Sequence, residues 1–170
     1  MTDIIFHHYP ISPFSEKIRL IFGFKQLKWQ SVLIPSIMPK PDVTALTGGY
    51  RRTPVMQIGA DIYCDTALIA DVLEQLAPTP SLYPPRLAGL ARNVAQWADS
   101  CLFWTAIAYA FQPAAIPGIL GNVTPEQMQA FTADRAAMRA GAPRMALGEA
   151  TAGMHEYLRR LSNMLEGGNT

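Results

Sequence analysis

The stretch that decides the fold is residues 9–20, YPISPFSEKIRL, in which an extended segment runs into a helix. Ser12 is typical of a helix N-cap, and Pro13 suits the first helical position, where a missing N–H removes no hydrogen bond. With cysteine in place of Ser12 and Ser15, this turn would carry a Cys-x-x-Cys redox motif. Because two serines cannot form a disulfide, dithiol redox chemistry is excluded at this turn.

The first half of the chain alternates predicted strands and helices around this turn. The predicted strands are residues 4–7, 29–34, 53–58 and 62–64, the last two forming a hairpin with its turn at residues 59–61. The helix that Ser12 opens runs to about Phe22, and Gly23 can end it. Residues 35–49 hold three prolines and two glycines, which predicts a loop with one helical turn near residues 42–46.

A capped helix and a proline-rich linker close this half. Asp65 or Thr66 caps the helix, and its apolar face consists of Leu68, Ile69, Val72, Leu73 and Leu76. The linker contains Pro78, Pro80, Pro84 and Pro85. Beyond it every predicted element is a helix: residues 86–111, residues 124–140 with a capping box at Thr124–Gln127, and a last helix to about Glu166 after a break at 141–143. A Pro/Gly loop is predicted at 112–123. The sequence thus predicts two domains, residues 1–83 and 86–170.

Composition excludes several functional classes. The chain has 170 residues, a formal charge of +1 and no block of Lys or Arg, so nucleic acid is not indicated as a partner. The start lacks the pattern of a signal peptide, and the most apolar stretch, residues 102–111, is too short to span a membrane. Two cysteines without an export signal, Cys64 and Cys101, predict reduced thiols and a cytoplasmic location. The sequence shows no metal-ligand cluster, since the adjacent His7 and His8 would face opposite ways on a strand.

Three motifs in this order and spacing carry a resemblance. They are residues 12–15, Thr53-Pro54-Val55 and Asp65-Thr66. Together they resemble the cytosolic glutathione S-transferase family, most closely its serine-type tau and zeta classes and its omega class, which has cysteine where this chain has Ser12. The resemblance implies an α/β thioredoxin-like N-terminal domain with a mixed four-stranded sheet, in the order β-α-β-α-β-β-α, followed by an all-α C-terminal domain. In that family the helical domain continues past an element like residues 145–166, so this one reads as C-terminally truncated.

The resemblance implies a catalytic role for the turn. A helix N-terminus carries roughly half a positive charge and unpaired N–H groups, so it favours an anion and eases ionisation of a thiol. The sulfur that the turn lacks would then come from bound reduced glutathione, with Ser12 donating a hydrogen bond to the thiolate. Ser15 or Tyr9 would be the fallback hydroxyl. The alternative is that Ser12 is only an N-cap. Cys64, in a hairpin strand, is more readily an inert buried thiol.

The resemblance also implies a binding site for glutathione. Thr53, before a cis Pro54, would pair through its backbone with the cysteinyl residue of glutathione, in the manner of an added strand. Asp65 would bind the γ-glutamyl amino group, and Thr66 with its helix N-terminus would hold the neighbouring carboxylate. The alternatives are an ordinary edge-strand proline and a plain N-cap.

Further site residues are weaker candidates. Arg51 or Arg52 could meet the glycine carboxylate of glutathione, with Lys40 as a rival and a solvated basic pair as the alternative. Trp104 and Tyr109 are candidates for the electrophile pocket, although apolar residues at helical spacing are more often core. A pairing of His7 or His8 with Ser12 lacks a third group to orient the histidine.

The expected reaction is attack of the glutathione thiolate on a small apolar electrophile, as in a detoxifying transferase. Glutathione would be a co-substrate, and no metal is required. The resemblance implies a homodimer, without nucleic acid or membrane as a partner. Three alternatives stay open: a glutathione-binding protein without turnover, an interaction module with the same fold, and another glutathione-dependent reaction such as dehalogenation, ether cleavage or isomerisation.

Overall fold

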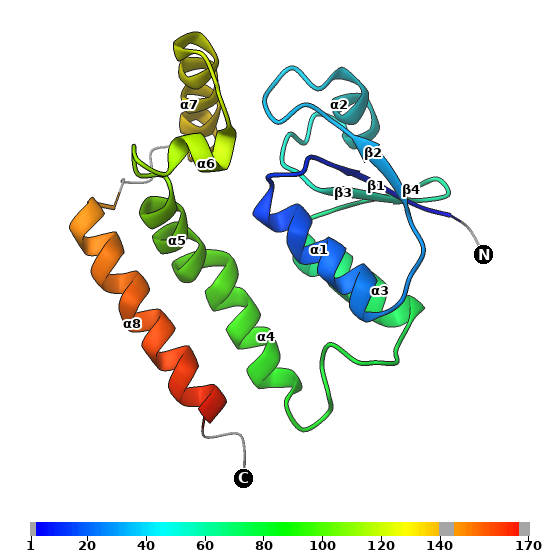
Figure 1. Ribbon diagram of the computed structural model, residues 1–170. Helices are drawn as coiled ribbons and strands as arrows, with labels where there is room; N and C mark the ends of the chain where they lie inside the picture. Colours follow the sequence, from blue (N-terminus) through cyan, green and yellow to red (C-terminus); the bar gives the residue numbers. More distant parts are fainter. Residues whose placement is uncertain (1–2, 140–144, 167–170) are drawn as a thin grey trace. The chain divides into compact units, whose positions relative to one another are not determined.

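The computed structural model describes residues 3–139 and 145–166. The chain divides into two compact units between Leu82 and Tyr83, and each is described by itself. The first unit contains a sheet with helices, and the second contains helices (Figure 1). No helix among the described residues is long and apolar enough to cross a membrane.

A mixed four-stranded sheet forms the centre of the first unit. The elements are β1 (Ile4–His8), α1 (Pro13–Phe24), β2 (Gln30–Leu33), α2 (Pro41–Thr47), β3 (Val55–Ile58), β4 (Asp61–Cys64) and α3 (Thr66–Leu76). The strand order is β2-β1-β3-β4, in which β2 is parallel to β1 and the other two pairs are antiparallel. Figure 1 shows α1 and α3 on one side of the sheet and α2 on the other. The predicted thioredoxin-like fold and element order are confirmed.

The predicted helix ends differ slightly from the observed ones. Gly23 does not end α1, which continues to Phe24 and is capped by the Lys25 N–H bonded to the Ile21 carbonyl. The chain reverses later, at Gln26, whose φ is 52°. The helix α2 is longer than the one predicted turn because Pro41 opens it and Gly48 closes it in the left-handed conformation.

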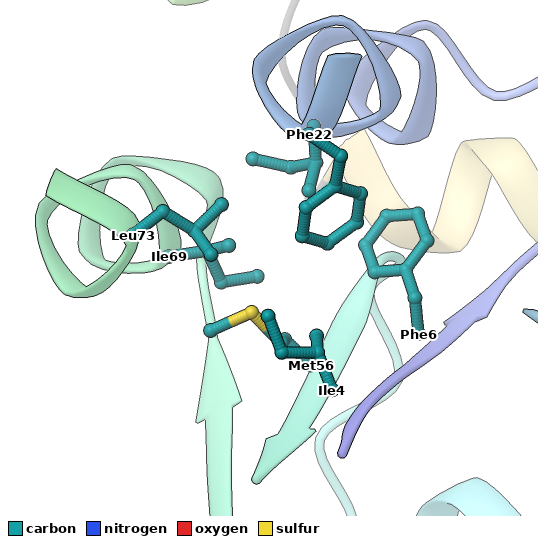
Figure 2. Close-up of a cluster of buried hydrophobic side chains, with 7 residues drawn as sticks. Ile4, Phe6, Phe22, Met56, Ile69 and Leu73 are labelled. Atoms are coloured by element: carbon teal, nitrogen blue, oxygen red, sulfur yellow. The ribbon is translucent and has the colours of Figure 1, made fainter. Parts of the chain in front are cut away.

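The core lies between the sheet and the pair α1 and α3. Its fully buried members include Phe6 of β1, Met56 of β3, Phe22 of α1 and Leu73 of α3 (Figure 2). The rings of Phe6 and Phe22 meet edge to face with centroids 5.2 Å apart. Burying side chains of this size contributes about 1.5–3 kcal/mol each, and this face therefore fixes how α1 and α3 lie on the sheet.

A buried lysine ties the end of α1 to the chain that leaves α3. The side chain of Lys25 is fully buried, and its Nζ donates to Glu74 Oε2 at 2.6 Å. The same ammonium donates to the carbonyls of Ala77 at 2.6 Å and Pro80 at 3.0 Å. Residues 25, 74, 77 and 80 are called the Lys25 clamp below.

The second unit is helical. Its elements are α4 (Ala88–Trp97), a π-helical segment (Ala98–Leu102), α5 (Phe103–Ala110), α6 (Ile116–Leu120), α7 (Pro125–Arg139) and α8 (Leu147–Glu166). The long helix predicted from residue 86 thus contains a π turn, which periodicity did not indicate. The predicted loop at 112–123 is partly wrong, because α6 lies within it. The predicted break at 141–143 and the helix end at Ala140 lie outside the described residues.

Two features of this unit follow from local and tertiary packing. The predicted capping box is confirmed: the Gln127 N–H donates to Thr124 Oγ1 at 3.3 Å, and the Thr124 N–H donates to Gln127 Oε1 at 2.9 Å. The helices α5 and α8 pack closely, and a Cβ added at Gly153 would lie 3.2 Å from Cγ2 of the buried Thr105. A small residue at position 153 therefore allows this approach.

Candidate functional site

The turn from β1 into α1 has the geometry of a side-chain N-cap. Ser12 Oγ accepts the backbone N–H of Ser15 at 3.2 Å, and the Ser12 carbonyl accepts the N–H of Glu16 at 2.9 Å. The backbone N–H of Ser12 donates to the Tyr9 carbonyl at 3.2 Å. Ser12 therefore sits at the positive end of α1, and its hydroxyl keeps its own proton to donate.

The second serine of the turn differs from the first. Ser15 is fully buried, and its Oγ has no hydrogen-bond partner among the described residues. A buried hydroxyl without a partner is unusual, because it loses water without compensation. Ser12 is also buried, at 2% exposure, but its oxygen caps the helix.

Three predicted site residues from separate segments lie close together, and one of them is a buried lysine. Lys40, at the start of α2, is 5% exposed and donates from Nζ to Thr53 Oγ1 at 2.9 Å. The same ammonium lies 5.2 Å from the centroid of the Tyr9 ring. Thr53 is joined to the buried Pro54 by a cis peptide bond, as predicted. The geometry thus brings Lys40, Tyr9 and Thr53 together.

The third motif lies at the start of α3. Asp65 is exposed, and its Oδ1 accepts the N–H of Ala67 at 2.8 Å, so it is Asp65 rather than Thr66 that caps the helix. Its φ is 80°, a left-handed value that a residue with a side chain rarely adopts. Residues held in such conformations concentrate at functional sites. Thr66 follows and is 6% exposed.

Lys17 is a candidate site residue that the sequence did not indicate. It lies on α1, and its Nζ donates to Thr66 Oγ1 of α3 at 3.1 Å. This contact places a cation at the N-terminus of α3. Only the packing of α1 against α3 creates this proximity, so no signal in the sequence could have identified Lys17.

Tyr50 is a second residue near the candidate site that the sequence did not indicate. Burial raises its pKa, while the charge of Arg52 lowers it and the charges of Asp65 and Cys64 raise it. Burial also raises the pKa of the Cys64 thiol, which disfavours the reactive thiolate. Arg51 is half-buried and Arg52 is exposed.

The family described as glutathione S-transferase, N-terminal domain, matches residues 6–81, which include all three motifs. Residues 6–81 belong to the glutathione S-transferase N-terminal domain family. No curated protein sequence matches it.

Solved structures of glutathione S-transferases share the fold. A glutathione S-transferase-like protein from Pseudomonas syringae is 45% identical over 91% of this chain, with a TM-score of 0.64. The chain spans 56% of the length of that protein. A glutathione S-transferase from Ceriporiopsis subvermispora, solved in complex with glutathione, is 16% identical, with a TM-score of 0.69 over 100% of this chain and 78% of its own. A glutathione transferase from Phanerochaete chrysosporium is 20% identical, with a TM-score of 0.69 over 99% of this chain and 74% of its own.

The two histidines of β1 contact groups other than Ser12. His8 Nε2 lies 2.8 Å from Ser31 Oγ, and its Nδ1 lies 2.9 Å from a nitrogen of Arg19. His7 Nε2 lies 3.3 Å from the side chain of a glutamine of β3. Both nitrogens of His8 are thus engaged elsewhere, which disfavours a serine–histidine pair with Ser12.

The two pocket candidates lie on α5 of the helical unit. Trp104 is 45% exposed and its ring meets that of Phe103 edge to face. Tyr109 is 36% exposed, and its ring centroid lies 6.2 Å from that of His155 on α8. Within residues 3–139 and 145–166, no group of three His, Cys, Asp or Glu side chains could hold a metal ion.

Proposed function

We propose that this protein binds reduced glutathione and activates its thiolate for attack on a small apolar electrophile. The observation that carries the proposal is the Ser12 hydroxyl at the N-cap of α1. A sulfur held there meets the positive end of the helix and a hydroxyl donor. The thiol pKa, ordinarily about 8.5, is then expected to fall, as it does for thiols at helix N-termini.

The chemistry that follows is nucleophilic attack by sulfur. The glutathione thiol gives its proton to solvent, and the thiolate forms a sulfur–carbon bond with the electrophile. In a substitution the leaving group departs with its electron pair as an anion. The protein contributes stabilisation of the thiolate and proximity of the two reactants. Tyr9 and Ser15 are the fallback hydroxyls, with Tyr9 ahead because Ser15 is fully buried.

The peptide would be held by the residues around Thr53. Its backbone, before the cis Pro54, is proposed to pair with the cysteinyl residue of glutathione. Lys40, already hydrogen-bonded to Thr53, is the favoured partner for the glycine carboxylate. Arg51 and Arg52 are the rivals, since arginine binds carboxylates through two parallel hydrogen bonds.

The γ-glutamyl end would lie at the start of α3. Asp65 is proposed to bind the amino group, and the Thr66 hydroxyl with the helix N-terminus the carboxylate. Lys17 adds a positive charge beside Thr66, so it is proposed to strengthen carboxylate binding. Residues 1–83 would form the glutathione-binding domain. Residues 86–170 would form a helical domain that supplies Trp104 and Tyr109 to the electrophile pocket. The protein is further proposed to be a cytoplasmic homodimer that needs no metal.

The test is calorimetric titration of reduced glutathione, followed by turnover with chlorodinitrobenzene. Asp65→Ala removes a charge-assisted hydrogen bond and is expected to weaken binding about tenfold to a hundredfold. Asp61→Ala, at an exposed position at the start of β4, is the matched control. Ser12→Ala is expected to bind glutathione but to lose most turnover. Ser12→Asp, which keeps a capping oxygen but offers no proton, should show the same loss with less effect on stability.

Each alternative has its own outcome. Wild-type binding without turnover on any electrophile would indicate a glutathione-binding protein. A folded sample that does not bind glutathione would indicate an interaction module. Turnover that survives Ser12→Ala unchanged would contradict the catalytic assignment. Substrate profiling separates conjugation from dehalogenation, ether cleavage and isomerisation.

A further inference from the structure

Arg19 of α1 reaches back over the turn that precedes its own helix. Its Nη2 donates to the Pro10 carbonyl at 2.9 Å, and its Nη1 lies 2.9 Å from His8 Nδ1. Its Nε donates to Glu16 Oε2 at 2.7 Å, one turn earlier on the helix. The side chain is only 21% exposed. One planar guanidinium thus joins α1, the end of β1 and the loop between them.

The contact with Arg19 decides which nitrogen of His8 carries the proton. Arginine only donates, so His8 Nδ1 must accept, and the proton lies on Nε2. Nε2 therefore donates to Ser31 Oγ of β2 at 2.8 Å. The ring is stacked on Phe6 and meets Trp29 edge to face, with centroids 5.0 Å and 5.5 Å away. His8 is therefore held as a neutral ring by two polar and two aromatic side chains.

We propose that Arg19 is a positioning residue for Ser12. This inference rests on the proposed role of Ser12 as the donor to the glutathione thiolate. The loop that Arg19 holds is residues 9–12, and the two anchored groups, His8 and the Pro10 carbonyl, flank Tyr9 directly. Fixing both sides of Tyr9 fixes the carbonyl that accepts the Ser12 N–H, and with it the start of α1.

The arrangement depends on pH through His8. Burial and the nearby charge of Arg19 lower the pKa of His8 below its ordinary 6.5. The groups that face the ring are Arg19 from α1, whose charge is shared with Glu16, and uncharged Ser31 from β2. Protonation would set an N–H at Nδ1 against the arginine N–H. Acid is therefore expected to release the Arg19 contact at a pH below 6.5, and not above it.

The experiment compares the wild type with Arg19→Met and Arg19→Lys in the full chain. Amide exchange at Ser12 is expected to quicken about tenfold in both variants, while amides in α3 exchange as in the wild type. Lysine does not rescue, because one ammonium cannot reproduce the planar fork. Nitrogen NMR of labelled histidine should show His8 moving from the Nε2–H tautomer to a mixture, with a raised pKa.

Function provides the second readout. With chlorodinitrobenzene, kcat is expected to fall about tenfold to a hundredfold, the range for a misplaced catalytic group, and the pKa of the bound glutathione thiol should rise. The affinity for glutathione should change less than about threefold, because Arg19 contacts none of the proposed binding residues. Arg159→Met and Arg159→Lys are the matched controls, since Arg159 is exposed and pairs with Glu156 three residues earlier on α8.

The outcomes separate this inference from the proposed function. Wild-type exchange at Ser12 in Arg19→Met overturns the positioning role, whether or not glutathione binds. Unchanged kcat and thiol pKa in a protein that does turn over also overturn it. If the wild type does not bind glutathione, the proposed function fails and takes the catalytic part of this inference with it. Should Arg19→Met not fold, Arg19→Lys and His8→Asn serve the same comparison.

Discussion

Replacing Lys25 with methionine should destabilise the first unit. The change keeps the apolar stem of the side chain and removes the ammonium at the centre of the Lys25 clamp. Three hydrogen bonds are lost together, to Glu74 Oε2 and to the carbonyls of Ala77 and Pro80. The connection between α3 and the linker that follows it then loses its tie to α1.

The size of this destabilisation follows from how deeply the two side chains of the Lys25–Glu74 ion pair are buried. The Lys25 side chain is fully buried and that of Glu74 is 20% exposed. Removing one partner of a fully buried pair costs about 3–5 kcal/mol, because the other charge stays behind unpaired. Glu74 keeps its hydrogen bonds from the Ser81 hydroxyl and the Leu82 N–H. We therefore expect a loss of about 2–3 kcal/mol in the free energy of unfolding.

Urea unfolding measures this loss, and its pH dependence gives a second check. Partial burial tends to raise the Glu74 pKa, but hydrogen bonds from Lys25, Ser81 and Leu82, with the charge of Lys25, lower it from 4.5 to about 2. The stability that these contacts provide is therefore complete above about pH 4.5 and is lost as pH falls towards 2. In Lys25→Met this acid dependence should be shallower.

Lys28→Met is the control, because Lys28 is exposed and close in sequence. Its unfolding free energy should stay within about 0.5 kcal/mol of the wild type. A loss of about 1 kcal/mol or less in Lys25→Met, the range of an exposed ion pair, would refute the reasoning.

Two further substitutions test other contacts. Gly153→Val places a branched side chain against the buried Thr105 and is expected to cost about 1–3 kcal/mol of unfolding free energy by overpacking. Gly148→Val on the same helix meets nothing within 4 Å and should be tolerated; equal effects in urea unfolding would show that close packing is not the cause. Lys17→Met removes the cation beside Thr66 and is expected to weaken glutathione binding about tenfold by calorimetry. Unchanged affinity would remove Lys17 from the proposed site.

Features that depend on a few neighbouring residues were predictable. Ser12 with Pro13 and the capping box at Thr124–Gln127 satisfy backbone groups within one helical turn, so the pattern alone indicates both helix starts. The extension of α1 past Gly23 and the helix α6 were missed. Glycine permits a helix end without requiring one, and short helices of five residues have weak local signals.

The sequence by itself determined the order of strands and helices in the first unit, the caps at Ser12 and Thr124, and the three motifs that carry the family resemblance. These depend on periodicity and capping, which act over a few residues. Only the tertiary structure decided the contacts of Lys17 with Thr66, Lys25 with Glu74 and Arg19 with His8. Each joins groups on separate elements, and a lysine or arginine in an amphipathic helix has the same local pattern whether it ends in solvent or in a buried pair. Packing of α1 against α3 and the sheet decides between these two outcomes, because it determines which charged side chains are removed from water.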